Sequence, residues 1–267
     1  MNVTLALLNA RLPLGPGVEV VAAHPSGLIA LSKPDGVMSH PNKGRGKSRS
    51  LLRADYDEQG EVYTWTASDS TTQRLHLLNR LDSPTSGVML ASTDDAVAAA
   101  VRAAFASHHV RKTYLAVVKG QPVPPHGVWR DKIQRQRTGE GHVRMRPGAV
   151  LGAQTQYRLR QAQARGHGLS LLELSPLTGR THQLRVQCSL HRCGILGDKT
   201  YGDFSFNRRV FAAGVPDRLY LHAERIALQV QVNGETIHFE AEVPVPALFQ
   251  TVVQGGSTAT PPHAPRR

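Results

Sequence analysis

The sequence predicts an α+β fold with a largely antiparallel sheet. Many segments alternate apolar and polar residues, which is the period of a half-buried strand. Far fewer segments have the spacing of an amphipathic helix. The chain has 267 residues, of which 40% are hydrophobic and 5% aromatic, so it can bury a large core with an ordinary globular composition.

Strands are predicted along most of the chain. Short apolar or β-branched runs bounded by turn residues indicate strands at 18–23, 28–32, 62–66, 88–92 and 112–119. Residues 128–175 alternate and contain few helix formers, so they are expected to be strands. Residues 219–232 and 236–243 flank Asn233-Gly234, which predicts a hairpin.

Three helices are predicted. The clearest covers residues 93–108, with apolar residues at helical spacing, Thr93 as a candidate cap, and Asp94 and Asp95 in the first turn, where the helix dipole favours acids. A second helix is expected at 182–190, after a turn at Gly179, and a short third one at 246–253.

The chain divides into a long body and two short ends. We expect a loose N-terminal arm at residues 1–17, one domain at 18–254, and a disordered tail at 255–267, which is rich in Gly, Ser, Thr and Pro. Residues 121–127 contain three prolines and serve as a connector within the domain. No linker is strong enough to split the body in two.

The charge indicates the class of partner. Lysine and arginine total 32 against 20 acids, a formal charge of +12, and the isoelectric point is near 10.3. The basic residues recur in separate clusters at 43–49, 130–146, 158–165, 180–192 and 208–209. This pattern favours a surface that binds a polyanion over a basic tail. No run of 18 apolar residues occurs, so no membrane partner is expected.

Cysteine usage indicates the compartment. The chain has two cysteines, Cys188 and Cys193, too few for a disulfide framework. The apolar N-terminal stretch lacks a basic leader, so no signal peptide is predicted. We therefore expect a cytoplasmic protein.

Several chemistries lack their sequence pattern. The stretch GRGKS at 44–48 resembles the end of a phosphate-binding loop, but Pro41 stands where that loop needs glycine. His182, Cys188, His191 and Cys193 do not have the spacing of a zinc finger or ribbon. No G-x-S-x-G elbow of a serine hydrolase occurs. We expect no metal and no nucleotide cofactor.

Asp82 is the acid with the most informative surroundings. It stands in LLNRLDSPTSG, residues 77–87, at the mouth of a small polar turn and two residues after Arg80. A carboxylate kept ionised by a nearby cation can act as a nucleophile. It can equally cap the turn by accepting the amides of Thr85 or Ser86. The local residues leave both interpretations open.

Four further stretches accompany this turn. The chain contains KPDGVMSHP at 33–41, RKTYLAVVKG at 111–120, and GRTHQLRV at 179–186 followed by GILGD at 194–198 and Tyr201-Gly202, then LHA at 221–223. Together with NRLDSPTSG, this ordered set resembles the motifs of the RluA-type RNA pseudouridine synthases, over about residues 28–245.

The resemblance implies a fold and a reaction. The fold is an α+β pseudouridine synthase catalytic fold with a bent, mostly antiparallel mixed sheet, flanking helices and a central basic cleft. The reaction is an isomerisation of specific uridines in rRNA or tRNA. The C1′–N1 bond breaks, the uracil turns, and C5 bonds to C1′. No cofactor or metal is implied.

The resemblance also implies roles for individual residues. Asp82 matches the catalytic aspartate, Tyr114 the active-site tyrosine, and Arg185 the arginine that pairs with the aspartate. Arg80 matches the arginine that enters the RNA stack where the target base leaves. Arg180, His182 and Leu184 are further candidate substrate-binding residues, with Leu184 at the uracil pocket.

The sequence departs from the family pattern in the catalytic motif. Asn79 replaces the usual histidine, and Ser83-Pro84 replaces a more common charged or polar pair, which puts substrate choice in doubt. Few residues precede the first matching strand, so we expect no S4 domain and an RNA grip made by the catalytic domain itself, probably as a monomer in the sense that no oligomerisation signal is found. Two rival hypotheses stay open, a non-catalytic RNA-binding protein and a hydrolase of nucleosides or glycosides.

Overall fold

The computed structural model describes residues 3–41, 46–137, 143–148, 151–163 and 166–255. The chain groups into two compact units. Unit 1 contains Met1–Tyr114, Ser175–Gly179 and Leu221–Val245, and unit 2 contains Leu115–Leu174, Arg180–Tyr220 and Pro246–Arg267. The chain passes between the units twice inside strands, within β7 (Arg111–Lys119) and β11 (Leu169–Pro176), rather than through a separate linker.

Unit 1 is a mixed sheet. Its strands are β1 (Glu19–Ala23), β2 (Leu28–Lys33), β3 (Asp55–Asp57), β4 (Val62–Thr66), β5 (Thr72–Leu77), β6 (Ser86–Ser92), β12 (Leu221–Val232), β13 (Glu235–Glu242) and the first residues of β7. The order runs β3-β4-β5-β6-β12-β7, while β2 pairs with β6 and β13 with β12. Only β6 and β12 are recorded as parallel among the registered pairs of this unit, so the predicted antiparallel character is confirmed.

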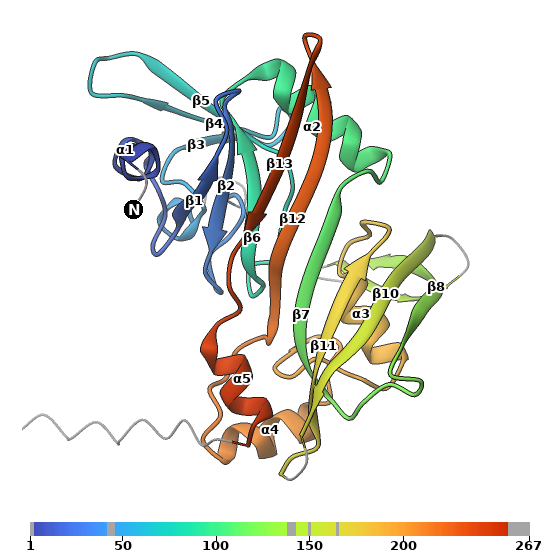
Figure 1. The fold of residues 1–267 in the computed structure, drawn as a ribbon. Helices are drawn as coiled ribbons and strands as arrows, with labels where there is room; N and C mark the ends of the chain where they lie inside the picture. Colours follow the sequence, from blue (N-terminus) through green and yellow to red (C-terminus); the bar gives the residue numbers. More distant parts are fainter. Residues whose placement is uncertain (1–2, 42–45, 138–142, 149–150, 164–165, 256–267) are drawn as a thin grey trace, which may run out of the picture. The chain divides into compact units, whose positions relative to one another are not determined.

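Strand β6 lies at the centre of this unit (Figure 1). All seven of its residues are buried, because β2 covers one edge and the other edge is shared by β5 and β12. β5 pairs with the end of β6 at Ala91 and Ser92, and β12 pairs with its beginning at Ser86 and Gly87. The residues between β5 and β6, which include the Asp82 turn, therefore lie where the edge partner of β6 changes.

Helix α2 (Asp95–Ala106) begins two residues later than predicted. Asp94, not Thr93, is its cap, since the Asp94 carboxylate accepts a hydrogen bond from the amide of Val97 at 2.8 Å. Its apolar stripe is buried as expected, with Val97 and Val101 in the core of unit 1.

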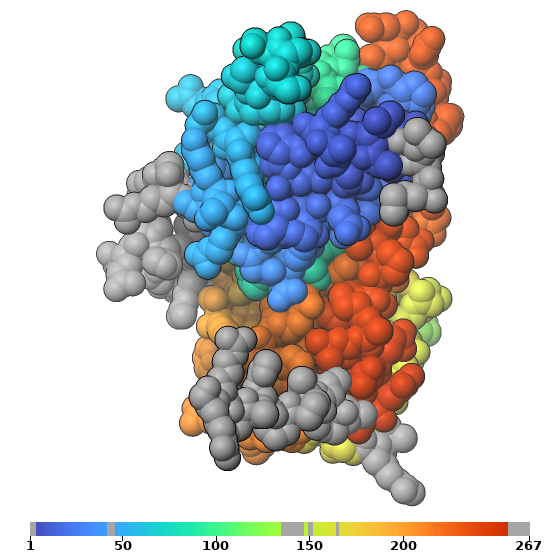
Figure 2. Space-filling view, turned by 90° about the vertical axis from the view of Figure 1, so that its left-hand side faces the viewer, coloured from blue at the N-terminus to red at the C-terminus, as the bar shows by residue number. Residues whose placement is uncertain are grey.

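The N-terminal stretch differs from the expected loose arm. It contains helix α1 (Val3–Arg11), and the side chain of Asn9 accepts the amide of Val20 at 2.8 Å. Leu14 also bridges to Leu52. Figure 2 shows this dark-blue segment packed beside the light-blue segment that follows β2. The limits of the predicted domain stay a prediction, and residues 256–267 of the predicted tail lie outside the described part.

Unit 2 is a second sheet with helices. Its order is β7-β11-β10-β8-β9, where β8 is His126–Arg137, β9 is Val143–Pro147 and β10 is Leu151–Ala162. These strands confirm the prediction for residues 128–175. Helices α3 (Gln183–Leu190) and α5 (Ala247–Val253) lie within a residue of their predicted positions.

Helix α4 (Phe204–Ala212) was not predicted. Its signals are nevertheless visible, since the Asp203 carboxylate caps it by accepting the amide of Phe206, and Phe206 and Val210 are buried at helical spacing. The predicted Asn233-Gly234 hairpin is confirmed between β12 and β13, where both turn residues have positive φ, as a type I′ turn requires.

Candidate active site

The Asp82 turn, residues 82–85, is closed by its main chain. The amide of Thr85 donates to the backbone carbonyl of Asp82 at 2.9 Å. Thr85 is buried and Asp82 is partly buried. The Thr85 amide therefore bonds the main chain of Asp82 rather than its carboxylate, which weakens the interpretation of Asp82 as a turn cap.

A buried lysine holds the same turn from below. Lys33, at the end of β2, is 1% exposed, and its Nζ donates to the carbonyls of Pro34, Val37 and Ser83 at 2.9, 2.6 and 3.0 Å. A buried ammonium needs such acceptors, since an unsolvated charge is costly. Lys33 thus ties the segment that follows β2 to the residue next to Asp82.

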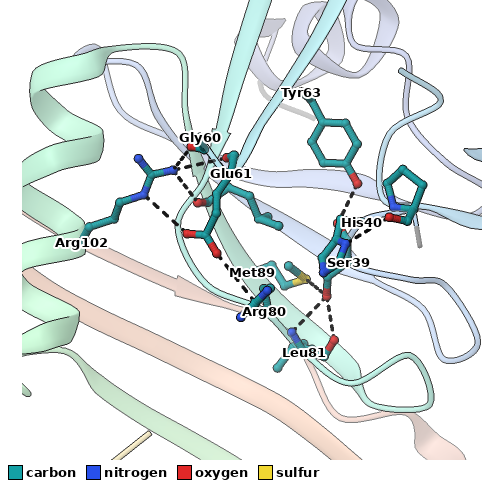
Figure 3. A network of polar contacts seen from close by, with 11 residues as sticks. Ser39, His40, Gly60, Glu61, Tyr63, Arg80, Leu81, Met89 and Arg102 are labelled. Atoms are coloured by element: carbon teal, nitrogen blue, oxygen red, sulfur yellow. Dashed lines mark hydrogen bonds and ion pairs between the residues drawn. The ribbon is translucent and has the colours of Figure 1, made fainter. Parts of the chain in front are cut away.

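Ser39 fixes the residue on the other side of Asp82. Its Oγ donates to the carbonyl of Leu81 at 2.7 Å and accepts the amide of Leu81 at 3.0 Å (Figure 3). The carbonyl of Ser39 in turn accepts the hydroxyl of Tyr63, which is fully buried. The backbone on both sides of Asp82 is therefore anchored to the 33–41 stretch.

We expect Ser39→Ala to lower the free energy of unfolding by about 1–3 kcal/mol, because the amide and carbonyl of Leu81 lose their partner in a buried site. Urea unfolding measures the change. The control is Ser107→Ala, which removes an exposed hydroxyl at the end of α2 and should change stability by about 0.5 kcal/mol or less. Equal effects of the two variants would show that Ser39 does not anchor Leu81.

Gly87 explains why the turn ends in glycine. Its φ is +120°, and a Cβ at this position would lie 2.1 Å from the carbonyl oxygen of Ala223 on β12. Gly87 and Ala223 are register partners in the parallel pair of β6 and β12. Only glycine allows β12 to approach β6 this closely, just after the Asp82 turn.

Asn79 has a structural role that the departure from the family pattern did not reveal. Its Oδ1 accepts the amide of Leu90 at 2.7 Å, next to the backbone bond from the amide of Leu78 to the carbonyl of Leu90. The side chain of Asn79 thus continues the pairing with β6 beyond the end of β5. This contact positions the residue directly before Arg80.

Arg80 is the exposed member of a small charged network (Figure 3). Its side chain is 60% exposed, and its Nε lies 3.8 Å from Oε1 of Glu61. Arg102 lies at 3.9 Å from the other oxygen of Glu61 and donates to the carbonyls of Gly60, Glu61 and Leu77. An exposed pair at this distance contributes little energy, so Arg80 can leave Glu61 for another anion at small cost.

Tyr114 lies on β7 at the end of unit 1. It is partly buried and packs against the core of that unit. Burial raises the pKa of the Tyr114 phenol well above its ordinary value, and the negative charge of Asp82 raises it further. The phenol is therefore neutral at physiological pH, and Tyr114 and Asp82 are close enough to interact electrostatically.

Arg185 has a buried partner that sequence reasoning missed. In unit 2, its Nε and Nη2 donate to the two carboxylate oxygens of Asp198 at 2.7 and 2.8 Å. Asp198 belongs to the GILGD stretch of the third motif, to which we gave no role. An acid at a fixed interval after a buried arginine in the same motif is the signal that could have identified it.

The remaining candidates also lie in unit 2. Arg180 donates from Nε to the carbonyl of Gly152 at 3.3 Å, and His182 is hydrogen-bonded through Nδ1 to the hydroxyl of Tyr201 at 2.8 Å. His182 precedes α3 with a φ of +53°, and Leu184 is buried inside that helix. Unit 1 therefore carries Arg80, Asp82 and Tyr114, and unit 2 carries Arg180, His182, Leu184 and Arg185.

A comparison with family models decides the family. Residues 27–190 match the model described as RNA pseudouridylate synthase. This chain belongs to that family. The matched region of the synthase contains Arg80, Asp82, Tyr114 and Arg185, and the family consists of isomerases that act on RNA.

Curated relatives agree with the family. The synthase is 36% identical over 234 residues to tRNA pseudouridine synthase C of Pectobacterium carotovorum subsp. carotovorum, covering 82% of this chain and 57% of that protein. It is 33% identical to tRNA pseudouridine synthase C of Salmonella typhi, covering 80% and 81%. It is 29% identical to Ribosomal large subunit pseudouridine synthase C of Rickettsia felis, covering 81% and 65%.

A solved structure supports the fold of the synthase. Human RNA Pseudouridylate Synthase Domain Containing 1 matches with a TM-score of 0.63 and 23% identity, covering 88% of this chain and 90% of that one. The predicted α+β class with a mixed sheet is thus confirmed. The central basic cleft stays a prediction.

The residues once weighed as zinc ligands have other surroundings in the synthase. Cys188 and Cys193 are buried free thiols, and burial raises the pKa of both, to about 11 for Cys193. The His191 ring stacks on Trp129 and contacts Asp131. In the part of the chain that the structure describes, no cluster of metal-ligating side chains occurs, and no helix is long and apolar enough to cross a membrane. Part of the 44–48 stretch lies outside that part.

Proposed function

We propose that this synthase isomerises a uridine of tRNA to pseudouridine, with Asp82 as the catalytic carboxylate. The family match over residues 27–190 carries this proposal, because it spans the stretch that contains Asp82. Transfer RNA is favoured because the relatives named as tRNA synthases are 36% and 33% identical, whereas the relative named for the large ribosomal subunit is 29% identical.

The reaction is balanced within the nucleotide. The C1′–N1 bond breaks, the uracil turns, and a C5–C1′ bond forms. The proton on C5 leaves, and N1 gains one. The Asp82 carboxylate either attacks the ribose or assists proton removal there, and both routes require an ionised acid. No cofactor takes part in this scheme.

Two further residues complete the proposed centre. The cation of Arg185 pairs with Asp82 and keeps it ionised and oriented. The ring of Tyr114 stacks on the uracil, and its oxygen assists removal of the C5 proton. The elevated pKa of Tyr114 favours the stacking role of a neutral phenol before the base enters.

The cationic side chains grip the RNA in this proposal. The chain is strongly basic, so phosphate contacts are expected to be salt-sensitive. Arg180 and His182 shape the substrate-binding region, and Leu184 lines the uracil pocket. We also propose a monomer in the cytoplasm, in keeping with bacterial relatives that modify RNA and with free buried thiols at Cys188 and Cys193. Light scattering of the purified protein tests the monomer.

Release of tritium from RNA labelled at C5 of uridine tests the activity. We expect release from tRNA and retention of the base on the chain, because isomerisation displaces only the C5 hydrogen. A hydrolase would liberate free uracil, and a non-catalytic RNA-binding protein would release no label. Release from ribosomal RNA alone would replace tRNA as the substrate class. Mapping of pseudouridines in cellular RNA, with and without the gene, then identifies the position.

Arg80→Ala tests the proposed filling of the RNA stack. A flipped base costs a few kcal/mol, and a planar cation in the gap offsets part of that cost. We expect kcat to fall by about 10- to 100-fold, while the Kd for RNA changes by about threefold or less. Arg74→Ala removes an exposed arginine from β5 and is the matched control. An unchanged kcat for Arg80→Ala would reject this role.

A further inference from the structure

The strongest uninterpreted feature of unit 2 is the buried pair of Arg185 and Asp198. Their side chains are 8% and 1% exposed. Two nearly parallel bonds of 2.7 and 2.8 Å join the guanidinium edge to the carboxylate. A bidentate pair of this kind fixes the plane of the guanidinium as well as its position.

Asp198 is itself held by the main chain. Its Oδ1 accepts the amides of Thr200 and Tyr201 at 2.8 and 3.0 Å. Burial alone would raise the pKa of the Asp198 carboxyl, but the hydrogen bond and charge of Arg185 together with these two amides lower it below its ordinary value. Asp198 is therefore an ionised acid in a rigid loop.

An aromatic ring fixes the guanidinium from a second direction. The centre of the Arg185 guanidinium lies 5.2 Å from the centroid of the Tyr201 ring. The hydroxyl of Tyr201 is hydrogen-bonded to His182, and its ring packs against Ile133, Ala153 and Val186. The loop after α3 thus holds Arg185 by its edge and by its face.

The pair uses only part of the arginine. A guanidinium carries five N–H donors, and Asp198 takes the one on Nε and one on Nη2. The donors on Nη1 and the second donor on Nη2 point to other acceptors. An arginine that has a structural acid on one edge can present its other edge to a reacting carboxylate in a fixed orientation.

We propose that Asp198 is the positioning residue for Arg185, and that it orients the guanidinium toward the catalytic carboxylate. This inference rests on the proposed pairing of Arg185 with Asp82. Asp198 contacts neither the RNA nor the reacting atoms, so it acts on the chemical step through Arg185 alone.

Asp198→Asn tests the proposal. The amide keeps one oxygen, but its NH2 group replaces the oxygen that accepts Nε, which places two donors face to face. We expect kcat to fall by about 100-fold with KM for RNA within about twofold, since a small misplacement of a catalytic group affects the chemical step rather than binding. Asp217→Asn, which removes an exposed acid paired with Lys199 in the same unit, should leave both constants unchanged.

A double-mutant cycle separates positioning from general damage. In an Arg185→Lys background the bidentate pair is already lost, so adding Asp198→Asn should change kcat by about threefold or less. An equal loss in both backgrounds, or a wild-type kcat for Asp198→Asn alone, would overturn the proposal. Circular dichroism and thermal melting verify folding of each variant.

Asp198→Glu carries the test if the asparagine variant does not fold. It keeps the charge but moves the carboxylate by one methylene, so we expect about a tenfold loss of kcat at an unchanged KM, and a wild-type kcat would overturn the proposal. Tritium release by the unmodified protein distinguishes the two levels. If it is absent with every RNA, the proposed function fails. If it is present but insensitive to Asp198, only this inference fails.

Discussion

Asp82→Asn is expected to lower kcat by about 10⁴-fold or more, while the Kd for RNA stays within about threefold. Asparagine has nearly the shape of aspartate, and the turn that carries it is closed by the backbone carbonyl of residue 82, which the substitution keeps. What is lost is the negative charge and the nucleophilic oxygen. Tritium release and filter binding measure the two quantities on the same preparation.

The matched control for this experiment is Asp69→Asn. Asp69 is an exposed acid in the turn before β5, where its carboxylate contacts Thr71. The substitution changes the net charge equally and should leave kcat and Kd unchanged. Turnover by Asp82→Asn at a rate near that of the unmodified protein would reject Asp82 as the catalytic carboxylate, whatever the effect on RNA binding.

Lys33→Met is expected to lower the free energy of unfolding by about 3 kcal/mol. Methionine fills a similar volume, but the carbonyls of Pro34, Val37 and Ser83 lose their shared donor in a buried site. The midpoint of urea unfolding measures this loss. Because Ser83 follows Asp82, kcat should also fall in the fraction that stays folded, with little change in the Kd for RNA.

Lys47→Met provides the comparison. Lys47 forms an ion pair with Asp55 in which both side chains are half exposed or more, and such pairs contribute about 0.5 kcal/mol or less. If Lys33→Met were no more destabilising than Lys47→Met, the buried ammonium would not hold the Asp82 turn. A large loss of stability with full kcat would mean that the turn keeps its geometry without Lys33.

Local signals predicted much of the secondary structure because they depend on residues close in sequence. The Asn-Gly turn between β12 and β13 and the apolar stripe of α2 are of this kind. The cap of α2 was placed one residue early because Thr93 and Asp94 are both acceptable caps, and only the observed backbone shows that the Asp94 carboxylate reaches the Val97 amide. Helix α1 was missed because packing on unit 1, rather than intrinsic propensity, supports it.

By itself, the sequence determined the family, the basic character of the chain and the candidate acids, since ordered motifs and net charge are properties of the residues alone. Tertiary structure decided which groups hold those candidates. Lys33 and Ser83 are 50 residues apart, Ser39 and Leu81 are 42 apart, and Arg185 and Asp198 are 13 apart. Each contact arises because chain segments that are distant in sequence are folded together around buried polar groups, and such groups must find partners wherever the fold provides them.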